Sequence, residues 1–177
     1  MKKLRIYIDM DGVLANFEKA KEEHPDFGKK GFRADLELDF STFAPMPGAI
    51  EAVHRLTEMG HELFIATTPP WDHPDAWGQK RHWVEKNLPS LKRKMFLTHR
   101  KDLLKGDILI DDTKYRGQPD FEGEWIHFGQ VKKVKTLSRW STKGWKDWDS
   151  VMKYIDKKYH TEPENEVVRV FERRLYT

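Results

Sequence analysis

Cysteine is absent from the 177-residue sequence. Its absence excludes disulfides, thiolate metal sites and a cysteine nucleophile, and it fits a reducing compartment. Long apolar runs are also missing, because the segment after Met1-Lys2-Lys3 reaches Asp9 and Asp11 within a few residues. A secretory signal needs roughly 7–15 uninterrupted apolar residues, and a membrane-spanning helix needs about 20. We therefore expect a soluble, cytoplasmic protein that has no membrane partner.

The composition is that of a folded globular protein, with 12% aromatic and 34% charged residues. The length suits one core with a small appendage. The net charge is only +3, yet residues 79–106 contain nine Lys or Arg against two acids, Glu85 and Asp102. Such a block suits a phosphorylated or polyanionic partner. On charge alone, a solvated helix face followed by a basic loop explains it better.

Short β-rich runs alternate with amphipathic segments along the chain. The pattern predicts strands at 4–8, 62–67, 94–98, 107–111 and 125–128, and helices at 13–23, 48–59, 74–88 and 148–159. Alternation of this kind indicates βαβ units. We therefore expect an α/β fold of three layers, with a Rossmann-like parallel sheet and helices on both of its faces.

One segment does not follow the alternation. Residues 18–45 combine scattered glycine and proline with four phenylalanines, Phe27, Phe32, Phe40 and Phe43. We interpret 18–45 as a small cap inserted after the first strand, and 1–17 with 46–159 as the core. Residues 160–177 form a tail of unknown role.

Polar residues follow the expected strands at the points where the strands end. In a parallel α/β sheet the ligand lies beyond those carboxyl ends. The candidates, in chain order, are Asp9, Asp11, Thr67, Thr68, Thr98, Lys101, Asp111 and Asp112. Carboxylates that meet in one crevice repel one another unless a divalent cation lies among them. Oxygen ligands without cysteine or paired histidine favour Mg²⁺ over zinc.

These residues resemble, in order and spacing, the four motifs of the haloacid dehalogenase-like phosphatases. The matching segments are Asp9-Met10-Asp11-Gly12-Val13, Ile65-Ala66-Thr67, Lys101 and Ile110-Asp111-Asp112. Within that superfamily the chain resembles the 5'(3')-deoxyribonucleotidases, through residues 9–17, 45–53, 83–86 and 106–112. The likeness spans about residues 4 to 158 and does not include the tail.

The resemblance implies a Mg²⁺-dependent phosphatase, a 5'-nucleotidase that hydrolyses deoxyribonucleoside monophosphates to nucleoside and phosphate. Asp9 would be the nucleophile that forms an aspartyl-phosphate, and Asp11 the general acid and base. The metal would be held by Asp9, Asp112 and the backbone carbonyl of Asp11. Asp111 would contact the metal directly or through another group.

The remaining implied roles concern the substrate. Thr67, Thr68, Lys101 and Lys80 would bind the phosphate. Phe17 matches an aromatic position at which the family contacts the substrate. The four cap phenylalanines are candidates by location only, and we expect at least two of them to pack the cap onto the sheet.

Two departures from the family leave alternatives open. Relatives commonly have Leu-Thr-Arg-Xaa-Lys where this chain has Leu97-Thr98-His99-Arg100-Lys101, so the arginine is displaced by one position. The cap is also short, which allows a changed nucleotide selectivity or a different small phosphorylated substrate. The second hypothesis is a phosphatase of the superfamily that acts on nucleic-acid 3'-phosphate ends or on another phosphorylated metabolite, and the basic block at 79–106 is its main support. A third hypothesis is a protein that binds a nucleotide or protein partner without catalysis. A nucleic-acid partner is not favoured, and the sequence does not decide whether the chain forms a homodimer.

Overall fold

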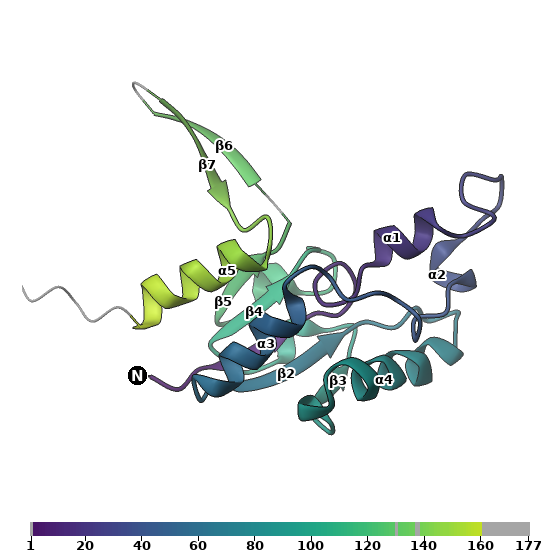
Figure 1. Cartoon of the computed structure of the whole chain (residues 1–177), viewed down its shortest axis with the longest axis horizontal. Coiled ribbons are helices and arrows are strands. Elements are labelled where there is room, and N and C mark those ends of the chain that lie inside the picture. Colours follow the sequence, from purple (N-terminus) through teal and green to yellow (C-terminus); the bar gives the residue numbers. More distant parts are fainter. Residues whose placement is uncertain (1, 130, 137–138, 161–177) are drawn as a thin grey trace, which may run out of the picture.

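The computed structural model describes residues 2–129, 131–136 and 139–160. Its centre is a sheet of five parallel strands in the order β3-β2-β1-β4-β5 (Figure 1). The strands are β1 (Arg5–Ile8), β2 (Glu62–Thr67), β3 (Met95–Leu97), β4 (Ile108–Asp111) and β5 (Glu124–His127). Each lies within one residue of its expected bounds, so the predicted parallel α/β fold is confirmed.

The strands at the centre of the sheet are buried on both faces. In β1, Ile6 and Ile8 are fully buried, and in β4, Ile108 and Ile110 are equally buried. Parallel strands covered on both faces are continuous hydrophobic runs rather than alternating ones. That property made these strands recognisable in the sequence.

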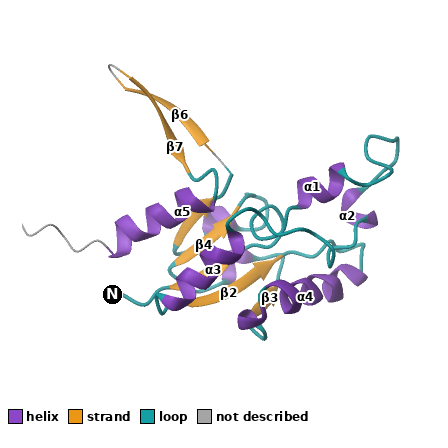
Figure 2. Cartoon of the chain, viewed as in Figure 1, coloured by secondary structure: helices purple, strands orange, loops and turns teal. Residues whose placement is uncertain are grey.

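Three long helices form the layer on one face of the sheet: α3 (Ala49–Glu58), α4 (Asp75–Asn87) and α5 (Trp148–Ile155) (Figure 2). Their buried side chains, among them Val53, Trp83 and Val151, join Ile6 and Ile8 in the larger hydrophobic cluster. A helix whose apolar stripe is buried against a sheet in this way stabilises both layers.

The opposite face is covered by shorter elements. The β3–β4 and β4–β5 connections contain single 3-10 turns, Lys101–Leu103 and Gln118–Asp120. They bring Leu104 and Phe121 against Tyr7 in a second, smaller hydrophobic cluster. We expected helices on both faces of the sheet, whereas in the described part of the chain the third layer consists of short 3-10 turns. The first of these turns begins at Lys101, which lies beside Asp9 at the carboxyl end of β1.

The first helix begins later than its pattern indicates. We expected a helix at 13–23, whereas α1 spans Phe17–Glu22. Asn16 accepts a hydrogen bond from the backbone N–H of Lys19 at 3.1 Å and so caps α1 at its observed start. Gly12 has a φ of +75°, a conformation that keeps the preceding segment out of a helix. The expected start was therefore wrong.

The segment predicted to be a cap contains α1 and one further helical turn, α2 (Ala34–Glu37), beside the strand ends (Figure 1). It is attached to α4 by two hydrogen bonds. The Trp83 indole N–H donates to the carbonyl oxygen of Phe43 at 2.7 Å, and the Phe40 N–H donates to Gln79 Oε1 at 3.1 Å. The division into cap and core remains a prediction.

Two features beyond β5 were not predicted. The antiparallel strands β6 (Val131–Thr136) and β7 (Arg139–Gly144) form a hairpin that extends away from the sheet (Figure 1). After α5 the chain continues in a wider π-helical turn, Asp156–His160, where we expected an unbroken helix to 159. The tail predicted for 160–177 lies, apart from His160, outside the described residues.

Candidate active site

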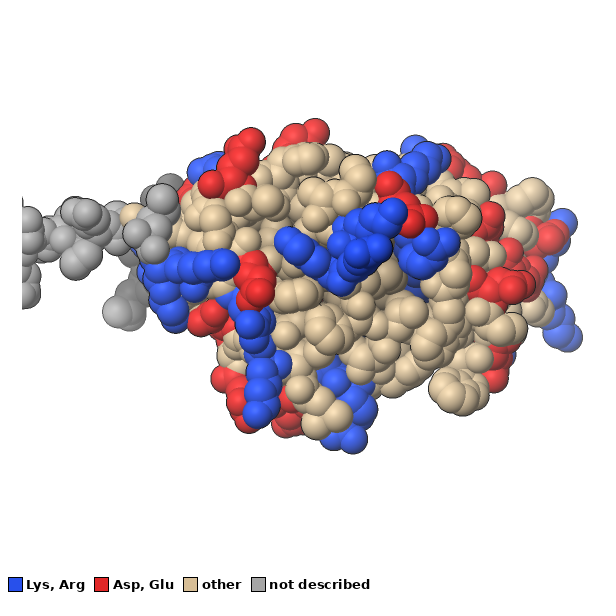
Figure 3. Space-filling view, turned by 90° about the horizontal axis from the view of Figure 1, so that it is seen from below, with Lys and Arg blue, Asp and Glu red and all other residues tan. Residues whose placement is uncertain are grey.

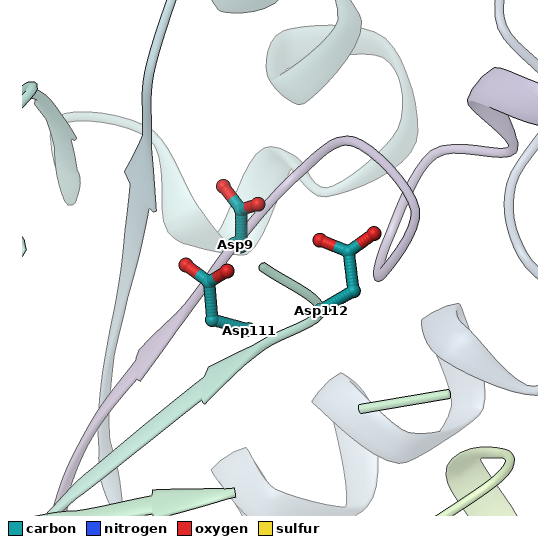
Figure 4. A group of neighbouring side chains, drawn as sticks. All are labelled: Asp9, Asp111 and Asp112. Carbon is teal, nitrogen blue, oxygen red and sulfur yellow. The ribbon is translucent and has the colours of Figure 1, made fainter. Parts of the chain in front are cut away.

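Three carboxylates meet at the carboxyl ends of the two central strands. Asp9 follows β1, Asp111 ends β4 and Asp112 follows it, and all three side chains point to the same side in Figure 4. One oxygen from each lies within 4.8 Å of the others. Because β1 and β4 are neighbouring parallel strands, the sheet itself places these residues together.

Lys101 lies between two of these carboxylates. Its side chain is buried, its Nζ is 2.9 Å from Asp9 Oδ1, and it also forms an ion pair with Asp111 Oδ2. The other oxygen of Asp111 accepts hydrogen bonds from the backbone N–H and the hydroxyl of Thr113, at 2.9 and 3.2 Å. Both oxygens of Asp111 are thus engaged, and its contacts are those of a residue that holds Lys101 in place.

Asp112 has a different environment. Its Oδ1 is buried and has no hydrogen-bond partner among the described residues, and the same is true of Asp11 Oδ1. A buried carboxylate oxygen without a partner is costly, so Asp112 Oδ1, which belongs to the aspartate cluster, fits a ligand of a cation. At Gly12, an added Cβ would lie 2.2 Å from Asp112 Oδ2. Glycine at position 12 therefore leaves the space that the Asp112 carboxylate occupies.

The clustered charges shift the pKa values of the carboxyl groups. Burial raises the pKa of Asp9 to about 8; Lys101 opposes this shift and Asp111 adds to it. Burial, followed by repulsion from Asp111, raises the pKa of Asp112 to about 6. Burial lowers the pKa of Lys101, but the carboxylates of Asp9 and Asp111 outweigh it and leave the pKa above its ordinary value. A divalent cation would relieve this repulsion.

Lys80 connects Asp11 to the end of β2. This lysine of α4 is fully buried, and its ammonium group binds Asp11 Oδ2 and Thr67 Oγ1, the latter at 3.1 Å. It also lies over the ring of Phe40, 4.5 Å from the centroid. Thr68 faces the same region, but its hydroxyl donates to the carbonyl of Thr98 at 2.6 Å. Of the two threonines, Thr67 therefore contacts Lys80, and Thr68 is bonded to Thr98.

The site contains a cavity of about 760 Å³. Its lining includes Asp9, Asp11, Thr68, Lys101 and Asp112, whereas Thr67, Lys80 and Asp111 are not among the lining residues. Among the cap aromatics, Phe17 and Phe40 line it. Phe43 is buried in the core, Phe32 packs against that core and stacks on the His24 ring, and Phe27 is exposed. The structure thus brings Phe17 and Phe40 to the site and leaves the other three cap aromatics away from it.

The rim of the cavity includes side chains that the sequence did not single out as site residues: Trp71, His99, Tyr115 and Arg116. Arg100, the displaced arginine, is not among the lining residues, because its guanidinium binds Asp102. His99 lies at the cavity instead. A sequence signal for this rim is the Pro69-Pro70 pair before Trp71, which follows the end of the strand expected at 62–67.

The basic block at 79–106 does not form one free surface. Lys80 and Lys101 are buried in the site, Arg81 and Lys92 pair with Glu85, and Arg100 pairs with Asp102. In Figure 3 the Lys and Arg side chains on one face form separate groups, several of them beside acidic side chains. Because several of these basic side chains are buried or paired in the folded protein, the block is weaker support for a polyanionic partner than its net charge suggests.

A Rossmann-like sheet with a buried lysine among aspartates at the ends of β1 and β4 defines a phosphatase of the haloacid dehalogenase-like class. The family model described as "5' nucleotidase, deoxy (Pyrimidine), cytosolic type C protein" matches residues 22–159. The chain belongs to this family, and it is a phosphoric monoester hydrolase.

Curated relatives support the same assignment. The chain is 35% identical over 154 residues to a putative 5'(3')-deoxyribonucleotidase of Vibrio phage KVP40, covering 85% of this chain and 83% of the relative. It is 31% identical over 164 residues to the human cytosolic-type 5'(3')-deoxyribonucleotidase, covering 70% and 78%. A putative 5'(3')-deoxyribonucleotidase of Bordetella bronchiseptica is 33% identical over 135 residues, covering 60% and 73%. These relatives support a nucleotide phosphatase activity, and the family together with the aspartate cluster suggests a divalent metal.

No helix in the described ranges has the length and apolar character needed to cross a membrane.

Proposed function

We propose that the protein is a Mg²⁺-dependent 5'-nucleotidase that hydrolyses deoxyribonucleoside monophosphates through an aspartyl-phosphate on Asp9. The observation that carries the proposal is the position of Asp9, buried at the end of β1 with one carboxylate oxygen 2.9 Å from the Lys101 ammonium. With Oδ1 held by Lys101, we assign the attack on phosphorus to the other oxygen. The names of the relatives support the nucleotide substrate.

The reaction proceeds in two displacements. Asp9 forms a bond to phosphorus while the bond from phosphorus to the ester oxygen breaks, and protonated Asp11 gives its proton to the leaving alkoxide. A water molecule then attacks phosphorus and gives a proton to the Asp11 carboxylate, which releases inorganic phosphate and restores Asp9. General acid–base catalysis of this kind contributes about 10²–10⁴-fold to the rate.

The residues at the cluster fit a hard divalent cation. We assign Asp9, Asp112 and the backbone carbonyl of Asp11 as its ligands, because the unpartnered oxygen of Asp112 and the space left by Gly12 favour this position. Asp111 supports the site by holding Lys101. When bound, Mg²⁺ supplies charge neutralisation between the carboxylate nucleophile and the phosphate dianion.

The phosphoryl oxygens are assigned to Thr67, Lys80 and Lys101. Both lysines are buried, so their charge acts on the phosphoryl group with little solvent screening. Lys80 contacts Asp11 and Thr67 together, and it therefore also orients the general acid and base. Thr68 remains a weaker candidate because its hydroxyl is already bonded to Thr98. Phe17 and Phe40 would contact the nucleoside from the cap side.

The proposal is tested with a panel of deoxyribonucleotides, ribonucleotides, phosphosugars and a 3'-phosphorylated oligonucleotide, each assayed with Mg²⁺ and with a chelator. We expect turnover of deoxyribonucleoside monophosphates that needs Mg²⁺ and is lost in Asp9→Asn. The matched control is Asp149→Asn, which changes an exposed aspartate that pairs with Lys153 on the surface. Turnover of another class with none of any nucleoside monophosphate would contradict the proposed substrate.

A further inference from the structure

Trp71 is exposed over 76% of its surface at the rim of the cavity that contains Asp9 and Lys101. Tryptophan is highly buried on average in folded proteins, so an indole left in water beside a cavity is informative. Nothing in the proposed phosphate chemistry uses this side chain.

The indole is held in a defined position. Trp71 follows two consecutive prolines, Pro69 and Pro70, and each proline ring fixes its φ, which restricts the conformations of the loop after β2. The ring of His99 contacts the indole edge to face, with the ring centroids 5.9 Å apart and the planes at 72°. His99 in turn lies 6.4 Å from the ring of Trp77. The loop and His99 therefore support Trp71 and leave most of its surface free for a ligand.

The cavity also contains aromatic rings on the cap side. Phe17 and Phe40 line it and stack on each other, with centroids 6.4 Å apart and planes at 30°. Asp9 and Lys101 line the same cavity at the strand ends. Its volume of about 760 Å³ lies within the range that holds a ligand the size of a nucleotide. The cavity thus combines a charged end suited to phosphate with aromatic side chains suited to a base.

Building on the function proposed above, we propose that Trp71, oriented by His99, stacks on the base of the nucleotide whose phosphate lies against Lys101. Every base has a π face, so stacking is tolerant of base identity. The contact therefore separates nucleotides from sugar phosphates that have no base, rather than one base from another. Stacking on an aromatic side chain has a strength that corresponds to about 5- to 150-fold in affinity.

The test compares the wild type with Trp71→Ala and Trp71→Phe, using dTMP, dUMP and deoxyribose 5-phosphate in the presence of Mg²⁺. We expect Trp71→Ala to raise KM for both nucleotides by about ten-fold. We expect kcat for the two nucleotides, and both KM and kcat for deoxyribose 5-phosphate, to stay at their wild-type values in this variant. Trp71→Phe keeps an aromatic face and stays close to the wild type. Phe27→Ala is the matched control, because Phe27 is an exposed aromatic that does not line the cavity.

A binding readout checks the contact without turnover. In an Asp9→Asn background we expect added dTMP to quench the indole fluorescence, and Trp71→Phe to remove most of that quenching although six other tryptophans remain. Equal effects of Trp71→Ala on nucleotides and on deoxyribose 5-phosphate, or no effect on either, would overturn the inference. By contrast, a wild type that hydrolyses deoxyribose 5-phosphate but no nucleotide would contradict the proposed function itself.

Discussion

Gly12 and Asp112 are in such close contact that a Cβ at position 12 would lie 2.2 Å from Asp112 Oδ2. We predict that Gly12→Ala displaces this carboxylate and weakens Mg²⁺ binding at least ten-fold, as measured by calorimetry. The matched control is Gly28→Ala: Gly28 also has a positive φ, +79°, but an added Cβ there has no neighbour within 4 Å among the described residues. Both variants carry backbone strain of about 1–2 kcal/mol, so only the crowding differs. Equal metal affinity in the two variants would contradict the prediction.

Asp111 and Asp112 are predicted to respond differently to substitution. Asp112→Asn removes the negative charge of a carboxylate that has an unpartnered oxygen and replaces one of its oxygens with an amide NH2 group, so we expect it to abolish measurable Mg²⁺ binding. Asp111→Asn leaves the buried Lys101 short of a charge partner, so its main effect is on the free energy of unfolding. Breaking a buried ion pair costs about 3–5 kcal/mol of stability. Because Lys101 keeps its pair with Asp9, we expect the loss in Asp111→Asn to lie near the lower of these values. Chemical denaturation measures the loss of stability and calorimetry the loss of Mg²⁺ affinity in both variants. If Asp111→Asn abolished Mg²⁺ binding and Asp112→Asn mainly lowered stability, the two assignments would be exchanged.

The metal-free protein is predicted to lose stability as pH rises from about 5 to 8. The pKa values of Asp112 and Asp9 are raised to about 6 and about 8, from an ordinary 3.8. The folded state therefore holds protons that the unfolded state has released, and stability falls as pH passes through the folded-state values. Thermal unfolding with a chelator measures this loss, and Asp112→Asn should reduce it. Stability that is constant or rising over this interval would contradict the raised pKa values.

Substitution of Lys80 is predicted to lower kcat/KM strongly, although the charged sequence of its helix, α4, suggests a surface position. Its ammonium group binds both Asp11 and Thr67, so Lys80→Met removes the partner of Asp11 Oδ2 together with the phosphate contact that we propose for Lys80. We expect kcat/KM to fall at least 100-fold, in line with the loss of one general acid–base contribution. Lys86→Met, on an exposed position of the same helix, is the control and should keep wild-type kinetics. Comparable losses in the two variants would contradict a specific role for Lys80.

A 3'-phosphorylated oligonucleotide is predicted to be a poor substrate compared with dTMP. Five of the nine basic residues in the block that favoured it pair with acidic side chains of the same chain, for example Arg81 with Glu85. Binding through phosphate contacts is strongly salt-dependent. We therefore expect kcat/KM for dTMP to exceed that for the oligonucleotide at low and at moderate salt. A preference for the oligonucleotide that fades with salt would favour the alternative substrate.

The sheet and the residues at its strand ends were predictable from local signals. Four of the five strands, β1 to β4, are short apolar runs that end in Asp or Thr or are followed directly by one, and parallel topology then brings Asp9 next to Asp111 without further information. The start of the first helix was not predictable to the residue. Its position depends on the Asn16 cap and on the left-handed backbone of Gly12, which override the apolar pattern of Val13 and Leu14.

Other features depend on tertiary contacts that a sequence pattern does not contain. The different environments of Asp111 and Asp112 follow from the direction of each side chain at the end of β4, and adjacent acids give no hint of it. The pairing of Arg100 with Asp102, which leaves His99 at the cavity beside Trp71, is likewise a contact that the sequence pattern does not reveal. The β6–β7 hairpin was missed because both strands, the lysine-rich β6 and the mostly polar β7, lack the apolar alternation by which strands are recognised.

The central claim is the covalent role of Asp9, and acid quenching during turnover of phosphorus-labelled dTMP tests it most directly. Peptide mapping of the quenched protein should place the label on the peptide that contains Asp9, and hydroxylamine, which cleaves acyl phosphates, should release it. Asp9→Asn should carry no label. An active wild type without any protein-bound label, or a label that persists in Asp9→Asn, would contradict the account.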